Sequence, residues 1–150
     1  MTAYYADTSA IAKRYISETG SNWIRGLVAP NSGNIIAICD LTPIEFFSLV
    51  ERRLREKRID FKTAGVLQTG FLKHTQSEYL SVILEQSVLI HARTLITKYP
   101  LRPPDAIQLA SAIEASTTLG VPLTFLCADN NLLSAVTAEG FAVDNPNLHP

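Results

Sequence analysis

Four acidic residues stand out among the fourteen in the chain because apolar residues flank them and each lies at a predicted strand end or helix start. They are Asp7, Glu45, Asp105 and Asp129. Ionised carboxylates that share a cleft repel each other unless a cation lies among them, and hard cations such as Mg²⁺ or Mn²⁺ prefer oxygen ligands. Such a cation orients and deprotonates water and stabilises charge on a phosphate. The pattern therefore favours a metal site for phosphodiester hydrolysis.

Each acid also has a purely structural interpretation as a helix cap. Asp is a preferred N-cap, and acids in a first helical turn interact favourably with the helix dipole. The segment 42–45 has the pattern of a capping box, with Thr42 as the cap, Pro43 at the first helical position and Glu45 three residues after the cap. Both interpretations stay open for any single acid, but their joint placement favours the metal site.

The elements that must position these acids alternate between short apolar runs and helical patterns. Strands are expected at 3–6, 35–39, 79–84 and 123–126, with a short fifth strand at 142–143. Helices are expected at about 9–16, 23–28, from 42, after Asp60, at 87–98, from 103 and at 131–138. The alternation predicts one α/β domain over residues 1–150, with a mostly parallel sheet of four or five strands and helices on both faces. Sites in such sheets form beyond the carboxyl ends of the strands.

Two helices after the second strand are predicted in more detail. The helix from Thr42 should bury one apolar stripe, made of Ile44, Phe47, Val50 and Leu54. Asp60 should cap the next helix, which should bury Ala64, Leu67 and Phe71.

Composition excludes several classes of protein. The chain has 150 residues, 47% of them hydrophobic, which excludes an intrinsically disordered protein. A net charge of −1 excludes a uniformly basic DNA-coating protein. Neither a membrane span nor a secretory signal is found, so a cytoplasmic location without membrane association is expected. Cys39 and Cys127 each follow an apolar run and are expected to be reduced thiols at strand ends.

Three other α/β enzyme or binding classes lack their required residues. A haloacid-dehalogenase-type phosphatase needs a second Asp two residues after the first, and Ser9 stands there. A receiver domain needs adjacent acids after the first strand, where Asp7 stands alone. A dinucleotide-binding fold needs a glycine-rich turn, and the segment 7–10 has no glycine.

The order of the four acids and the segments around them resemble the PIN-domain nucleases, and most of all the VapC-type toxins of toxin–antitoxin pairs. The resemblance runs from Tyr4 to Pro146. It is carried by the segments Tyr5-Ala6-Asp7-Thr8-Ser9-Ala10, Thr42-Pro43-Ile44-Glu45, Arg102-Pro103-Pro104-Asp105-Ala106-Ile107-Gln108-Leu109-Ala110 and Phe125-Leu126-Cys127-Ala128-Asp129.

The resemblance implies a function and a site. The four acids would form the metal-binding pocket of a Mg²⁺- or Mn²⁺-dependent endoribonuclease, with Thr8 or Ser9 as a supporting hydroxyl. Family members often have Thr or Ser two residues before the last acid, where this chain has Cys127. The resemblance also implies a homodimer and a small antitoxin protein, expected in an apolar groove that includes Trp23 and Phe46 or Phe47. A PIN-like module that binds RNA or protein without catalysis is the alternative.

A basic run follows Glu45 on the same predicted helix. It places five cations within seven positions: Arg52, Arg53, Arg55, Lys57 and Arg58. Such a run is either a solvated helix end or a surface that contacts RNA phosphates. Lys13 and Arg14, about two turns after Asp7, are a second candidate contact with RNA.

Overall fold

The computed structural model describes residues 2–150 and contains a five-stranded parallel sheet. The strands are β1 (Ala3–Ala6), β2 (Ile35–Cys39), β3 (Leu80–Val82), β4 (Thr124–Leu126) and β5 (Ala142–Asp144). Their order is β3-β2-β1-β4-β5, so β2 and β3 are added on one side of β1 and β4 and β5 on the other. The order reverses between β1 and β4, and sites in parallel sheets form at such a switch point. The predicted fold class is confirmed.

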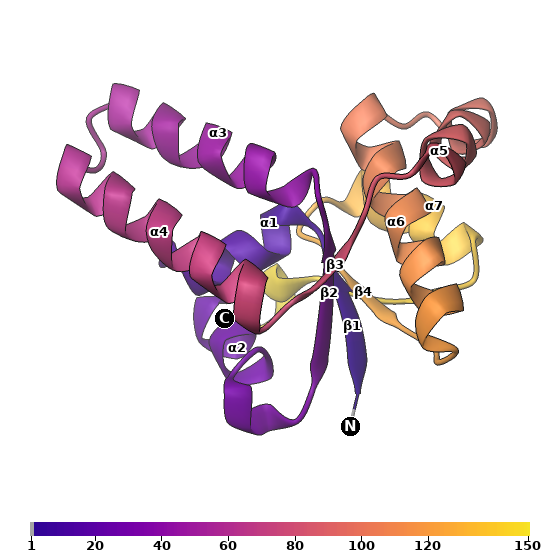
Figure 1. Cartoon of the computed structure of the whole chain (residues 1–150), viewed down its shortest axis with the longest axis horizontal. Helices are drawn as coiled ribbons and strands as arrows, with labels where there is room; N and C mark the ends of the chain where they lie inside the picture. The colour runs from indigo at the N-terminus through magenta and orange to yellow at the C-terminus, as the bar shows by residue number, and fades with distance from the viewer. Residues whose placement is uncertain (1) are drawn as a thin grey trace.

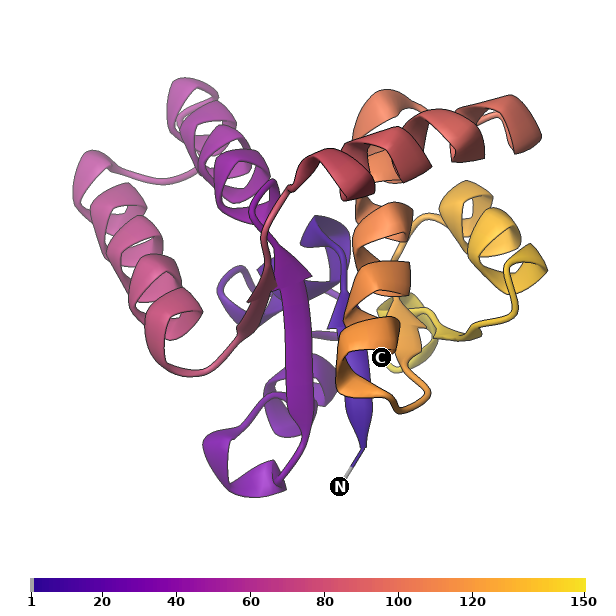
Figure 2. The ribbon, with the colours of Figure 1, turned by 45° about the vertical axis from the view of Figure 1, so that its right-hand side comes forward.

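The helices fill the connections between strands. They are α1 (Thr8–Ile11), α2 (Ser21–Leu27), α3 (Thr42–Arg55), α4 (Phe61–Ser77), α5 (Gln86–Lys98), α6 (Pro103–Leu119) and α7 (Asn130–Ala138). Short 3₁₀ segments follow at Ala12–Arg14, Pro30–Ser32 and Pro146–Leu148. Helices α1 to α4 cover one face of the sheet, and α5 to α7 cover the other (Figures 1 and 2).

The two faces of the sheet have separate apolar cores because successive residues of a strand point to opposite sides. Tyr5 is fully buried on the face of α5 to α7, where its ring stacks on Phe125 with centroids 5.2 Å apart. Ala6, the next residue, packs on the face of α1 to α4. There Phe46 of α3 stacks on Phe71 of α4, with centroids 4.4 Å apart.

Helix α3 buries Val50 as predicted, with Phe47 and Leu54 partly buried against the same core, but it differs from the prediction at Ile44 and in its cap. Ile44 is 68% exposed, whereas Phe46 is fully buried. The helix begins at Thr42 and its N-cap is Leu41, which makes no side-chain cap, so the predicted capping box is wrong. The reason is that the Thr42 side chain is buried in the fold, where its hydroxyl is 3.4 Å from Gln108 Nε2.

Helix α4 begins as predicted. Asp60 is its N-cap, and the Oδ1 atom of Asp60 accepts a hydrogen bond of 2.7 Å from the backbone N–H of Thr63. Two of the three residues predicted to be buried, Ala64 and Phe71, are buried. Within residues 2–150, no helix has the length and apolar content needed to cross a membrane.

Candidate active site

Asp7 lies at the switch point of the sheet. The register pairs Ala6 of β1 with Leu126 of β4, and the backbone N–H of Asp7 donates to the carbonyl of Leu126 at 3.1 Å. The Asp7 side chain caps α1: its Oδ1 accepts from the Ala10 N–H at 3.1 Å and from Ser9 Oγ at 2.7 Å. Asp7 is therefore both a cap and a strand-end acid, and the two interpretations of this residue do not exclude each other.

The Asp7 carboxyl is buried, with 6% of the residue exposed. Burial raises its pKa from 3.8 to about 6, and the nearby charge of Glu45 acts in the same direction. Hydrogen bonds from Ser9, Cys127 and Ala10 oppose this rise. A buried carboxylate beside a second carboxylate is an unfavourable arrangement that a bound cation would relieve.

Cys127, the residue after β4, supports Asp7. Its Sγ is 3.0 Å from Asp7 Oδ2 and donates a hydrogen bond to it. Burial, and then the charge of Asp7, raise the pKa of this thiol, which stays protonated as a donor. Both cysteines are free and buried at strand ends, as predicted. The thiol thus occupies the place expected of a hydroxyl and makes a polar contact there.

Glu45 faces the same region from the first turn of α3. Its Oε1 accepts hydrogen bonds from Thr8 Oγ1 at 2.8 Å and from Gln108 Nε2 at 2.7 Å. Gln108 Oε1 accepts in turn from the hydroxyl of Tyr5 at 2.7 Å. This buried chain of contacts ties Glu45 to the residue beside Asp7 and to the centre of the sheet.

Gln108 is a site residue that sequence reasoning missed. It is a long polar side chain on the buried side of α6, which otherwise carries mainly alanine and leucine. It also lies three residues after Asp105, on the next turn of the same helix. A buried amide needs partners, so a polar residue within this apolar helix face was the available signal.

Asp105 lies in the first turn of α6, and Asp129 lies between β4 and α7. Asp129 caps α7, since its Oδ1 accepts from the Asn131 N–H at 2.9 Å. Asp105 is not a cap; its Oδ2 is 3.1 Å from Arg102 Nε. The hydrogen bond to Asp105 raises the pKa of Arg102, and the charges of Asp129 and Glu45 contribute to the same rise. Three of the acids therefore act on one guanidinium.

The acids offer oxygen ligands that suit a hard cation. Among residues 2–150, however, no three His, Cys, Asp or Glu side chains are placed to ligate one metal ion together. Mg²⁺ is commonly held by one or two carboxylates, with waters and substrate phosphates as the other ligands. Asp7 fits that mode of binding, with Glu45 as the second carboxylate. Burial and the charge of Glu45 both raise the pKa of Asp7, and a bound cation would offset both effects.

The predicted RNA-binding residues divide into paired and open side chains. Arg52, Arg55 and Lys57 are exposed, as is Arg58, which is 3.9 Å from Glu56. Arg53 is partly buried and forms an ion pair with Glu18. Arg14 bonds Glu78 and Tyr79 at 2.7 Å each, so its guanidinium is held within the fold. Lys13 is buried.

The expected antitoxin groove changes in composition. Phe46 lies in the core and cannot line a surface groove, which leaves Phe47 of the two alternatives. Trp23 is partly buried, and His149 stacks on its indole ring with centroids 4.0 Å apart. Phe47 is partly buried against the core of α1 to α4.

A sequence model of the PIN domain matches residues 4–119. The chain belongs to the PIN domain family. The match confirms the resemblance expected from the sequence and covers β1 to α6, with Asp7, Glu45 and Asp105. In this PIN domain Asp129 and β5 lie beyond the matched residues, yet β5 pairs with β4 in the same sheet. No curated protein is similar enough to count as a relative.

Solved structures share the fold over nearly the whole chain. One is VapC20 of Mycobacterium tuberculosis, described as a sarcin-ricin loop cleaving toxin: 14% identity, 98% of this chain and 99% of that chain covered, TM-score 0.65. Another is VapBC2 of Rickettsia felis bound to a DNA fragment from its promoter: 13% identity, 96% and 98% covered, TM-score 0.64. A third, PAE2754 of Pyrobaculum aerophilum, has 18% identity, 98% and 85% covered, and a TM-score of 0.64. At these identities the likeness shows the fold.

Proposed function

We propose that this PIN domain is a metal-dependent endoribonuclease that uses Mg²⁺ or Mn²⁺ to hydrolyse phosphodiester bonds of RNA. The observation that carries the proposal is the buried Asp7 carboxylate at the switch point, with Glu45 close enough to raise its pKa. A structural cap does not need to be buried beside a second acid, as exposed Asp60 shows for α4. Asp105 and Asp129 complete the proposed site.

The residues of the chain divide the work of this site. Asp7 and Glu45 would hold the cation, which lowers the pKa of a bound water and stabilises negative charge on the scissile phosphate. Thr8 and Gln108 fix the Glu45 carboxylate, and Ser9 and Cys127 fix that of Asp7. Such fixed ligands need no reorganisation when substrate binds.

We further propose that the protein is the toxin of a type II toxin–antitoxin pair and acts in the cytoplasm as a homodimer. The fold shared with VapC20, which is described as a toxin, supports the toxin role. A small antitoxin protein as the partner follows from the resemblance to VapC-type toxins. The two free thiols suit a reducing compartment. We also infer that residues 1–150 form one PIN-like domain, because β4 and β5 extend the sheet of the matched region.

The test is cleavage of a fluorescently labelled single-stranded RNA by purified protein. We expect internal cleavage with Mg²⁺ or Mn²⁺ and none with EDTA. Protein that binds this RNA in EDTA but leaves it intact in both metals would instead be the non-catalytic module. Cleavage that persists in EDTA would contradict the proposed metal dependence.

A further inference from the structure

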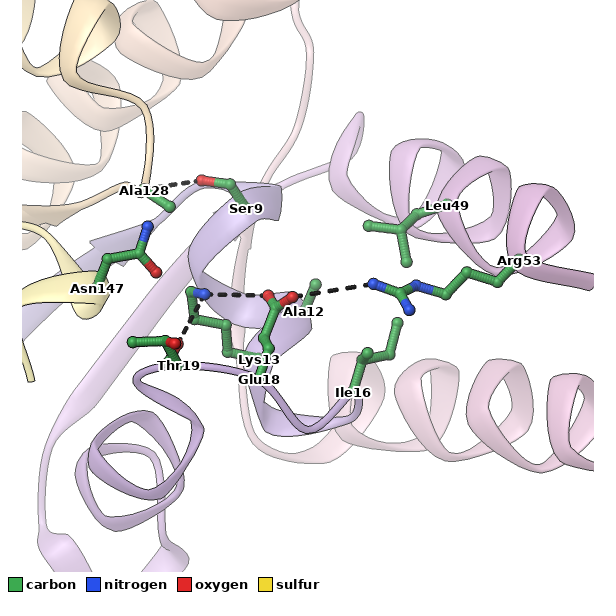
Figure 3. A pocket seen from close by; sticks show the side chains of 10 residues that line it. All are labelled: Ser9, Ala12, Lys13, Ile16, Glu18, Thr19, Leu49, Arg53, Ala128 and Asn147. Carbon is green, nitrogen blue, oxygen red and sulfur yellow. Dashed lines mark hydrogen bonds and ion pairs between the residues drawn. The ribbon is translucent and has the colours of Figure 1, made fainter. Parts of the chain in front are cut away.

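A cleft of about 360 Å³ is lined on one side by Ser9, the residue two positions after Asp7 (Figure 3). Ser9 forms part of its wall and also donates to Asp7 Oδ1, so the cleft opens next to the proposed site of cleavage. Helix α3 supplies the opposite wall with Leu49 and Arg53, and Lys13 lies at its base between the two sides. The cleft therefore joins the acidic site to the basic helix.

The charges in this cleft are two cations and one anion. Lys13 is only 4% exposed. Its ammonium donates hydrogen bonds to Glu18 Oε1 at 3.0 Å and to the Thr19 carbonyl at 2.8 Å. An ammonium has three N–H donors, so one remains. Arg53 Nη2 is 3.8 Å from Glu18 Oε2, and within residues 2–150 the Arg53 guanidinium donates no hydrogen bond. The net charge is +1, and donors are left over.

The cations continue past this cleft along α3 and the turn that follows it. A second hollow of about 180 Å³ is lined by Leu49, Arg52, Arg53, Glu56 and Arg58. Leu49 and Arg53 line both hollows, which therefore adjoin each other along one side of α3. Aromatic side chains, on which bases stack, line neither of them. This surface suits a sugar-phosphate backbone rather than unstacked bases.

We propose that the two hollows form a phosphate track, defined by Lys13, Arg53, Arg52 and Arg58, that binds successive phosphates of the RNA strand on one side of the cut. This proposal rests on the proposed function in one respect only, namely that the bound strand is RNA. The Glu18 carboxylate lies between Lys13 and Arg53, where a phosphate of the strand would otherwise bind (Figure 3). In this arrangement Glu18 weakens binding, and a strand displaces its carboxylate from Arg53.

The first test measures RNA affinity rather than cleavage. Binding of a labelled single-stranded RNA is followed by fluorescence anisotropy in EDTA at several salt concentrations. Arg53→Gln should raise Kd about fivefold at 0.1 M salt. It should also make the slope of the log binding constant against log salt less negative by about 0.7, the value for one lost phosphate contact on a single strand. Arg93→Gln, an exposed arginine of α5, is the matched control and should leave both unchanged.

The second test changes the anion. Glu18→Gln keeps an acceptor for Lys13 but removes the charge, so it should lower Kd by about fivefold at 0.1 M salt and steepen the slope. A solvated ion pair with no part in binding predicts no change in either variant, and that result overturns the track. Neutralising single phosphates as methylphosphonates adds a direct readout, since Arg53→Gln should cost nothing on the RNA that lacks its partner phosphate.

These binding results are independent of catalysis. A protein that binds RNA with the predicted changes but never cleaves it would retain the track and lose the nuclease proposal. A protein that cleaves RNA with Arg53→Gln and Glu18→Gln both at wild-type affinity would retain the nuclease and lose the track.

Discussion

Replacing Asp7 with Asn should stabilise the protein at pH 8 in the absence of divalent metal. The carboxyl has a pKa of about 6 in the fold against 3.8 ordinarily. Between these two pH values the folded state binds more protons than the unfolded state, so the free energy of unfolding falls as pH rises. The full destabilisation by ionised Asp7 is present above pH 6. The difference corresponds to about 3 kcal/mol.

Asn keeps most of the local contacts. Its side-chain oxygen can accept from Ala10 and Ser9, as Asp7 Oδ1 does, and Asn caps helices about as well as Asp. The amide nitrogen then faces the Cys127 sulfur in place of Oδ2. Allowing for that weaker contact, the free energy of unfolding should rise by about 1–3 kcal/mol at pH 8 and by little at pH 4.

The assay is urea denaturation at pH 4 and pH 8 in EDTA, with the denaturant slope checked for equality between variants. Asp60→Asn is the matched control because Asp60 also caps a helix but is exposed. Hydrogen bonding to Thr63 lowers the Asp60 pKa, so its stabilisation is present above the unfolded pKa and Asn should slightly destabilise at pH 8. Equal stability of Asp7→Asn and wild type at pH 8, or an equal gain at both pH values, would refute the reasoning.

Three further outcomes follow from the contacts of the site. Mn²⁺ at a hundred times its Kd should stabilise the wild type by about 2.7 kcal/mol at pH 8 and Asp7→Asn far less, measured by urea denaturation; equal gains would place the ion elsewhere. Gln108→Leu should lower the free energy of unfolding by about 2 kcal/mol or more, because it removes one donor to Glu45 and the acceptor of the buried Tyr5 hydroxyl; a variant as stable as the wild type would show that the amide is dispensable. Cys127→Ser should lower the pKa of Asp7 in an NMR titration, because a hydroxyl is a stronger donor than a thiol, and an unchanged pKa would contradict that contact.

The strand-end acids and the order of elements could be predicted because both leave a local signal. Asp7 and Asp129 directly follow apolar runs, and a parallel sheet brings such ends together at one edge. The alternation of strands and helices likewise needs no long-range information. The predicted roles of the acids as ligands remain predictions that the experiments here address.

Other features depend on contacts between distant residues. Thr42-Pro43-Ile44-Glu45 has the same letters whether Thr42 caps its own helix or is buried against Gln108, 66 positions away. Phe46 and Phe47 are adjacent and point about 100° apart around the axis of α3. Packing against α4, which no local pattern specifies, decides that Phe46 is the one that meets Phe71. The sequence around Lys13 indicates an exposed cation, but hydrogen bonds to Glu18 and to the Thr19 carbonyl allow this side chain to be buried.

The central claim is that these acids are ligands of a catalytic cation rather than caps alone. Single-turnover RNA cleavage in Mn²⁺ by Asp7→Asn, Asp129→Asn and Asp60→Asn tests it most directly, because all three are caps and Asn preserves each cap. The account predicts that the first two variants lose on the order of 10²-fold or more in rate while Asp60→Asn cleaves like the wild type. Wild-type rates in all three variants would contradict it.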